Sequence, residues 1–171
     1  MLSQTEVRLR GPLAATDPDL VSVIRNKFLK APSKFPYNLT SLIDDEYHFH
    51  KFTHASYVLI NSILDDLYFI DDITYRGKER FFVEAGGLDG EFLSNTLRLE
   101  REMSWNGLIV EPNSRNFKLI QQKHRKAWIS PVCLSKHEYP YMAVIKEKNY
   151  DNNEMQSRNS AIQVSYLIYR T

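Results

Sequence analysis

The amino-acid sequence predicts an α/β fold, in which three parallel strands are joined by crossover helices and preceded by N-terminal helices. Three observations lead to this prediction: apolar strand-like runs alternate with helix-like runs, the first strand ends in a glycine-rich turn, and an acidic residue ends the second. The expected strands are Arg80 to Glu84, Gly107 to Glu111 and Ala127 to Leu134, and the expected helices are Glu91 to Met103 and Asn113 to His124.

Residues 1–75 are expected to form an N-terminal helical extension. Thr16-Asp17-Pro18 predicts a helix start, because it combines a capping side chain with a proline in the first turn. A second helix is expected from Ala55 to Phe69. In the first helix Leu20, Ile24 and Phe28 recur every four residues and predict its buried face, and in the second Leu59, Ile63 and Leu67 share one face.

Residues 76–171 are expected to form a partial Rossmann-like domain, the first half of a nucleotide-binding sheet. Beyond Ser135 the pattern weakens. Tyr139 to Lys146 predicts a short strand, and the segment Met155 to Thr171 contains an edge-strand alternation of Ile162, Val164 and Tyr166. Trp105 and Trp128 are expected to pack in the core and its turns.

Composition excludes several classes of function. The 171 residues carry 22 basic and 21 acidic side chains, and this near-balance gives no electrostatic reason to expect a nucleic-acid partner. Cys133 is the single cysteine, so an intrachain disulfide and a cysteine-rich metal site are both excluded. No apolar run approaches the length of a membrane span, and Met1 to Arg10 lacks the apolar stretch of a secretory signal. A soluble, cytoplasmic chain is therefore expected.

Two patterns could suggest a metal site. His48, His50 and His54 lie close together, but no cysteine or carboxylate pattern supports them as zinc ligands, so exposed loop residues are favoured. Asp65-Asp66 and Asp71-Asp72 lie around the end of the second helix, where solvated acidic residues are the favoured interpretation.

The turn after the first expected strand is the strongest functional motif. Its glycines allow the backbone to turn sharply and a ligand to approach without Cβ atoms in the way. Its acidic residues disfavour a phosphate at the expected helix start, and they suit a ligand with a cationic amino group, such as the methionine part of S-adenosylmethionine. The candidate binding residues in this turn are Glu84, Gly86, Gly87, Asp89 and Gly90, and Glu91 adds a further negative charge.

Two further strand ends complete the candidate site. Glu111 ends the second expected strand, where a carboxylate can accept hydrogen bonds from both ribose hydroxyls of an adenosine. Cys133 and Leu134 end the third expected strand and could border the adenine, because ligands of open α/β sheets lie across these strand ends. The alternative, a tight turn that binds no ligand, stays open for the glycine motif taken alone.

These motifs resemble the animal FkbM-type methyltransferase domain, and within it the Star-like proteins of arthropods. The resemblance spans about Asp17 to Ser135. The segments that carry it are Phe82 to Glu91, Ser94 to Leu97, Trp105 to Leu108, Val110 to Asn113 and Arg125 to Trp128.

The resemblance implies a class I methyltransferase fold that uses S-adenosylmethionine, typically to methylate a hydroxyl oxygen. It places Glu84, Gly86 and Asp89 around the methionine part of the donor and Glu111 at the ribose. Star-like proteins act in secretory and endosomal trafficking of membrane growth-factor precursors. The resemblance therefore also implies an alternative, a non-catalytic trafficking protein of the Golgi and endosomes that binds membrane cargo.

The sequence departs from the family after Ser135, because the strands that follow the third have no counterpart before Thr171. A fragment, or a domain completed by a partner, is therefore expected, and catalysis by this chain alone is left undecided. The strand Arg80 to Glu84 would then have an uncovered edge. We expect Met155 to Thr171 to fold back onto that edge or to be disordered, and the chain to be marginally stable or to self-associate.

Overall fold

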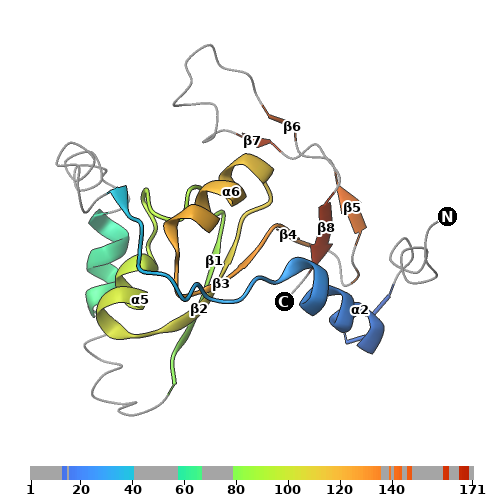
Figure 1. Cartoon of the computed structure of the whole chain (residues 1–171), viewed down its shortest axis with the longest axis horizontal. Helices are drawn as coiled ribbons and strands as arrows, with labels where there is room; N and C mark the ends of the chain where they lie inside the picture. Colours follow the sequence, from blue (N-terminus) through green and yellow to red (C-terminus); the bar gives the residue numbers. More distant parts are fainter. Residues whose placement is uncertain are drawn as a thin grey trace.

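A three-stranded parallel sheet lies at the centre of the computed structural model (Figure 1). The structure describes residues 13–14, 16–40, 58–66, 79–135 and 139, and the backbone of residues 141–143, 146–147, 160–161 and 166–169. The strands β1 (Phe81–Ala85), β2 (Asn106–Val110) and β3 (Trp128–Ser130) are hydrogen-bonded in that order, with Val83, Leu108 and Trp128 in register. The predicted parallel sheet is therefore confirmed, with β1 and β2 each shifted by one residue.

Helices α5 (Leu97–Met103) and α6 (Ser114–Lys123) both cover the same face of this sheet. Alternate residues of a strand point to opposite faces, so Phe82, Ile109 and Ile129 share the covered face. They form one core cluster with side chains from the helices and from the segment before β3. Its buried members are Phe82, Leu99, Ile109, Phe117, Ile120, Ala127 and Ile129, and Trp105 packs against it.

The opposite face of the sheet is exposed and apolar. Phe81, Val83 and Trp128 point to it, and they are 58%, 50% and 41% exposed. Trp128 was expected in the core, but it lies outside it because its side chain faces away from α6. Parallel sheets are normally buried on both faces. In the described part of this chain, by contrast, helices cover only one face of the sheet.

The outer edge of β1 has no strand partner within the described part of the chain. Residues 166–169 form β8 (Tyr166–Tyr169), which pairs in parallel with β4 (Cys133–Leu134) and antiparallel with β5 (Tyr141–Ala143). The expected return of this segment to β1 is therefore wrong, because β4 and β5 take its hydrogen bonds. Ile162 and Val164 lie outside the described residues. The strands β6 (Lys146–Glu147) and β7 (Ser160–Ala161) form a separate pair.

The expected strand from Ala127 to Leu134 is divided in two. β3 ends at Ser130 and β4 begins at Cys133, in a different sheet. Pro131 lies between them, and a proline has no N–H with which to continue a ladder.

The N-terminal helices match the expected positions but bury less than expected. Asp17 caps α2 (Pro18–Val23) by accepting from two backbone N–H groups, and η1 (Ile24–Phe28) continues it as a wider π turn. Leu20 is buried, whereas Ile24 and Phe28 are half-buried. The second helix is described at 58–66, where the apolar side chains of its shared face are largely exposed: Leu59 62% and Ile63 50%.

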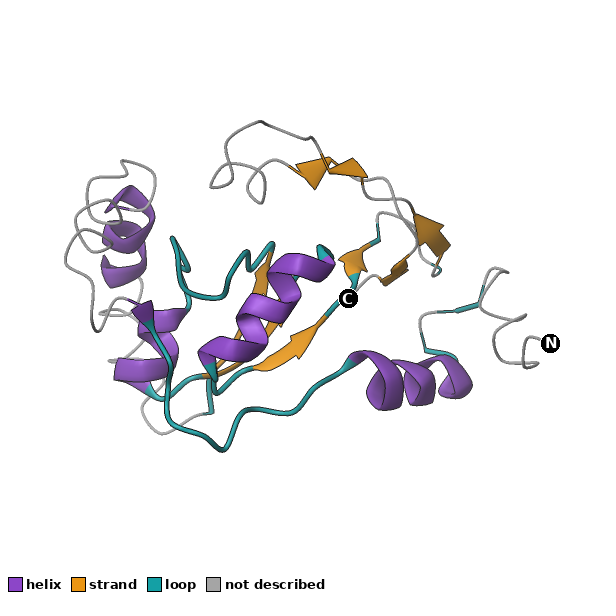
Figure 2. Ribbon diagram, turned by 45° about the horizontal axis from the view of Figure 1, so that its top comes forward, coloured by secondary structure: helices purple, strands orange, loops and turns teal. Residues whose placement is uncertain are grey.

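Residues 30–40, called the strap below, follow η1 and run along the sheet and the end of α6 (Figure 2). Lys30 exchanges two backbone hydrogen bonds with Ile129, of 2.9 and 3.1 Å, and so covers part of the outer edge of β3. The backbone N–H of Asn38 donates to the carbonyl of Lys123 at 3.1 Å, and thus satisfies one of the last carbonyls of α6. The strap is therefore attached to the sheet domain.

The exposed sheet face leads to a test of self-association. We expect the chain to associate as its concentration rises, and Val83→Lys to reduce this association, because a charge on the exposed face opposes apolar contact. Leu119→Lys is the matched control, since Leu119 is also exposed but lies on α6. Sedimentation velocity at several concentrations measures both. A monomer at every concentration would contradict the prediction.

Candidate ligand-binding site at the carboxyl edge of the sheet

The glycines of the turn after β1 are required for two different reasons. Gly86 has a φ of +82°, and a Cβ built there would meet nothing within 4 Å. A Cβ on Gly87 would lie 2.2 Å from Cγ2 of Ile109, and one on Gly90 would lie 3.2 Å from Cγ1 of Ile120. Gly87 and Gly90 therefore serve packing against the core. Gly86 alone leaves open space where a ligand could approach.

Glu111 follows β2 directly and is 5% exposed. Its Oε2 accepts from the backbone N–H of Leu88 at 2.8 Å, and its Oε1 accepts from that of Asn113 at 2.8 Å. Burial raises the pKa of the Glu111 carboxyl, and these two backbone hydrogen bonds oppose that rise in part. The carboxylate is thus fixed between the glycine-rich turn and the start of α6, at the position expected for a ribose acceptor.

Cys133 lies near this carboxylate. Its thiol is buried, and its pKa is raised first by burial and then by the negative charge of Glu111. The structure therefore brings these two candidate residues together, although Glu111 follows β2 and Cys133 lies on β4, in a different sheet. The neighbouring Leu134 is 43% exposed, which is consistent with the alternation of side chains along a strand.

Glu84 holds the loop of residues 91–96. Its Oε2 accepts from Ser94 Oγ at 2.9 Å and from Thr96 Oγ1 at 2.6 Å, and its Oε1 accepts from the backbone N–H of Asn95 at 3.2 Å. A carboxylate has about four acceptor positions, so these three donors leave one for a ligand.

The expected helix from Glu91 to Met103 begins six residues later, at Leu97. Within the expected helix Leu93 adopts a φ of +56°, and the hydroxyls of Ser94 and Thr96 donate to Glu84. The prediction missed these features because hydroxyl-containing residues compete with a helix through side-chain bonds that depend on tertiary contacts.

The two acidic residues at that expected helix start therefore have other roles. Asp89 Oδ1 accepts from the backbone N–H groups of Glu91 at 2.9 Å and Phe92 at 2.7 Å, and so closes a turn. Glu91 is fully buried, and its Oε2 accepts from Lys123 Nζ at 2.7 Å and from the backbone N–H of Thr40 at 2.8 Å. Lys123 thus already neutralises the Glu91 charge that was expected to face a cationic ligand.

Arg125 holds the turn and the loop of the site together, and no function was assigned to it from the sequence. It is 2% exposed, and its Nε donates to Glu100 Oε2 at 3.0 Å. Its two other nitrogens donate to the carbonyl of Gly90, to Ser94 Oγ at 3.2 Å and to Thr96 Oγ1 at 3.2 Å. The sequence contained one signal of such a partner: Glu100 lies three residues after Leu97, on the same buried helical face, and a buried carboxylate favours a cationic partner.

No group of three or more potential metal ligands occurs among the residues that the structure describes. Asp65 pairs with Arg98, and His48, His50, His54 and Asp71-Asp72 lie outside the described residues. None of the helices in the described ranges has the length and apolarity that a membrane span requires.

The buried pair predicts a large loss of stability on truncation. Arg125→Met should lower the free energy of unfolding by about 3–5 kcal/mol, because it leaves the Glu100 carboxylate buried without its cation. The control Arg98→Met removes exposed pairs with Asp65 and Glu102 and should cost less than about 1 kcal/mol. Urea unfolding measures both. Equal losses in the free energy of unfolding would show that burial does not make the Arg125 pair more important for stability than the exposed pairs.

Comparisons of the chain with protein-family models, with curated proteins and with solved structures found no match. The resemblance to the FkbM-type methyltransferase domain therefore stays a prediction from the motifs themselves.

Proposed function

We propose that the carboxyl edge of β1, β2 and β3 binds S-adenosylmethionine, and that the chain carries the donor-binding half of an FkbM-type methyltransferase. One observation carries this proposal: the buried carboxylate of Glu111, at the end of β2, accepts a hydrogen bond from Leu88, in the turn after β1 that also contains the open position at Gly86. In open parallel sheets, nucleotides lie across this edge, with an acidic residue at the ribose.

The charges at this edge favour S-adenosylmethionine over a phosphate-containing nucleotide. Residues 84–91 contain three acidic side chains and no basic one. Two cations contact this segment, Lys123 and Arg125, and they are paired with Glu91 and Glu100. A di- or triphosphate would meet net negative charge here, whereas the ammonium and sulfonium groups of S-adenosylmethionine would be attracted.

The residues present fit this ligand in three places. Glu111 would accept hydrogen bonds from the ribose hydroxyls, the remaining acceptor position of Glu84 would face the ammonium group, and Cys133 would border the adenine. The bound donor would supply a methyl group on a positively charged sulfur. By resemblance the acceptor is a hydroxyl oxygen, and no residue is assigned here to the transfer step.

The exposed sheet face favours a second candidate function, that of a non-catalytic interaction protein on the same scaffold. Phe81, Val83 and Trp128 form an apolar surface of the kind that contacts another protein. By resemblance to Star-like proteins its partner would be a component of secretory or endosomal trafficking. Absence of S-adenosylmethionine binding by the folded chain would favour this candidate.

Calorimetric titration with S-adenosylhomocysteine, the demethylated product, tests the first proposal. We expect binding by the native chain and none, or far weaker binding, with ATP. Glu111→Ala should weaken binding by about 1–3 kcal/mol, because the ligand hydroxyls lose a charged acceptor. Glu102→Ala, which changes an exposed carboxylate on α5, is the control and should bind normally. No heat at millimolar ligand, with the chain shown to be folded, would refute the proposal.

The raised pKa of Glu111 predicts that binding depends on pH. The ionised carboxylate is the better acceptor of ribose hydroxyls, so affinity should increase as pH rises through that raised pKa and then level off. In the ligand-free chain the sign is opposite: stability from this group is greatest below its unfolded pKa of about 4.3 and is lost as pH rises towards the folded value. Titrations from mildly acidic to neutral pH should show the increase in native chain and lack it in Glu111→Ala.

A further inference from the structure

The strap of residues 30–40 is connected to the candidate site through buried side chains. Tyr37 Oη donates to Glu100 Oε1 at 2.9 Å, and Glu100 Oε2 accepts from Arg125 Nε at 3.0 Å. Burial, followed by the negative charge of Glu100, raises the pKa of the Tyr37 hydroxyl, so this group stays a donor at physiological pH. The hydroxyl of the strap thus fixes the acid that orients Arg125.

Arg125 transmits this contact to the loop. Its terminal nitrogens donate to Ser94 Oγ and Thr96 Oγ1, both at 3.2 Å, and these same hydroxyls donate onward to Glu84 Oε2 at 2.9 and 2.6 Å. Because each hydroxyl accepts from Arg125, its own hydrogen is directed at Glu84. The guanidinium therefore determines the direction of the hydroxyls that hold the Glu84 carboxylate.

A second contact attaches the strap to the same loop. The backbone N–H of Thr40 donates to Glu91 Oε2 at 2.8 Å, and Lys123 Nζ bridges Thr40 Oγ1 and Glu91 Oε2 at 2.7 Å each. Glu91 is fully buried, so this contact is shielded from water. The loop 91–96 is thus held by the strap at both of its sides, through Glu91 and through Arg125.

We propose that Tyr37 is a positioning residue for the ligand site, and that the strap sets the affinity of the loop 91–96 by orienting Glu84 through Glu100 and Arg125. This proposal rests on the proposed function for its ligand. Anything that separates Tyr37 from Glu100 would weaken donor binding, and bound donor would in turn stabilise that contact, since coupling between two sites is reciprocal. The N-terminal segment is then a regulator of the site.

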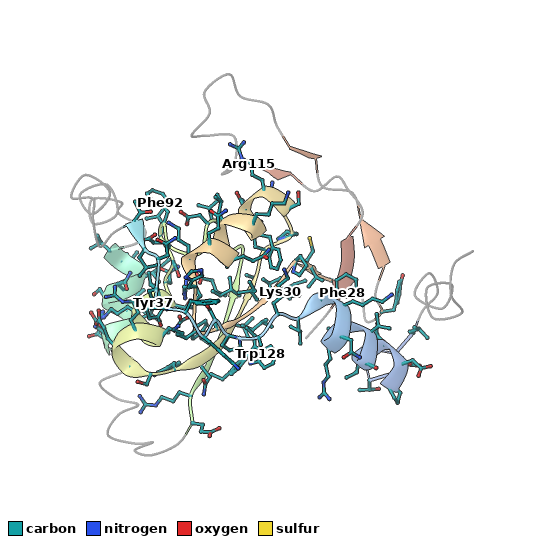
Figure 3. The ribbon with its side chains drawn as sticks, viewed as in Figure 1. Phe28, Lys30, Tyr37, Phe92, Arg115 and Trp128 are labelled. Carbon is teal, nitrogen blue, oxygen red and sulfur yellow. The ribbon has the colours of Figure 1, made fainter. Side chains whose placement is uncertain are left out.

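A matched pair of variants tests the proposal. Tyr37→Phe removes only the hydroxyl that contacts Glu100. Lys30→Met removes a tether of similar kind at the other end of the strap, where Lys30 Nζ donates to Gln121 Oε1 at 2.7 Å, away from the loop (Figure 3). Affinity for S-adenosylhomocysteine should fall about 2- to 30-fold in Tyr37→Phe and stay unchanged in Lys30→Met.

A double-mutant cycle separates positioning from general loss of structure. If Tyr37 acts through Glu84, then Tyr37→Phe should change the affinity little once Glu84→Gln is present, because the oriented group is already altered. Equal effects of Tyr37→Phe in the two backgrounds, or an equal loss of affinity in Lys30→Met, would overturn the proposal.

Hydrogen exchange keeps the proposal testable without any ligand. The backbone N–H of Asn95 donates to Glu84 Oε1 at 3.2 Å, so its protection reports whether Glu84 is held. Tyr37→Phe should speed exchange at Asn95, and Lys30→Met should not. If the native chain binds no S-adenosylhomocysteine but shows this difference, the proposed function fails while the positioning role of Tyr37 holds; no difference at Asn95 overturns the positioning role itself.

Discussion

The buried ion pair of Arg125 with Glu100 is the interaction on which the rest of the site depends. Both side chains are 1% exposed, and removing two charges from water is unfavourable unless hydrogen bonds satisfy their remaining groups. Here three segments supply such groups: the strap through Tyr37, the turn through the Gly90 carbonyl and the loop through two hydroxyls. The pair can stay buried only while these elements are in place, so it links their positions.

This dependence explains why similar side chains have different roles at one sheet edge. Glu84, Glu91 and Glu111 all lie near the ends of β1 and β2, but Glu84 holds hydroxyls, Glu91 holds a lysine and the strap, and Glu111 holds two backbone N–H groups. Burial raises the pKa of the Glu111 carboxyl and outweighs the hydrogen bonds that lower it. Ionisation of this buried carboxylate disfavours folding, but the ionised group could accept hydrogen bonds from a ligand. A buried ionisable group with a shifted pKa is typical of functional positions.

The sheet itself is asymmetric. One face packs Phe82, Ile109 and Ile129 against α5 and α6, while the other exposes Phe81, Val83 and Trp128. Full burial of an apolar side chain contributes about 1.5–3 kcal/mol, and these half-exposed side chains gain only part of it, so the stability of the sheet comes from one layer of helices and from the strap along β3. An exposed face of this kind favours contact with another protein surface, and it lies apart from the carboxyl edge where the ligand is proposed to bind.

The sequence by itself determined the parallel order of β1, β2 and β3, the cap of α2 at Asp17, and the placement of Glu111 at a strand end, because these follow from local apolar period and turn chemistry. Only the tertiary structure decided where α5 begins, which partner β8 takes and which helical faces are buried. Those outcomes depend on groups distant in sequence: Glu84 draws the hydroxyls of residues 94 and 96 out of a helix, and β4 and β5 compete with β1 for one strand. The role of Arg125 was hidden for the same reason, since a charge becomes structural only when the fold encloses it among its partners.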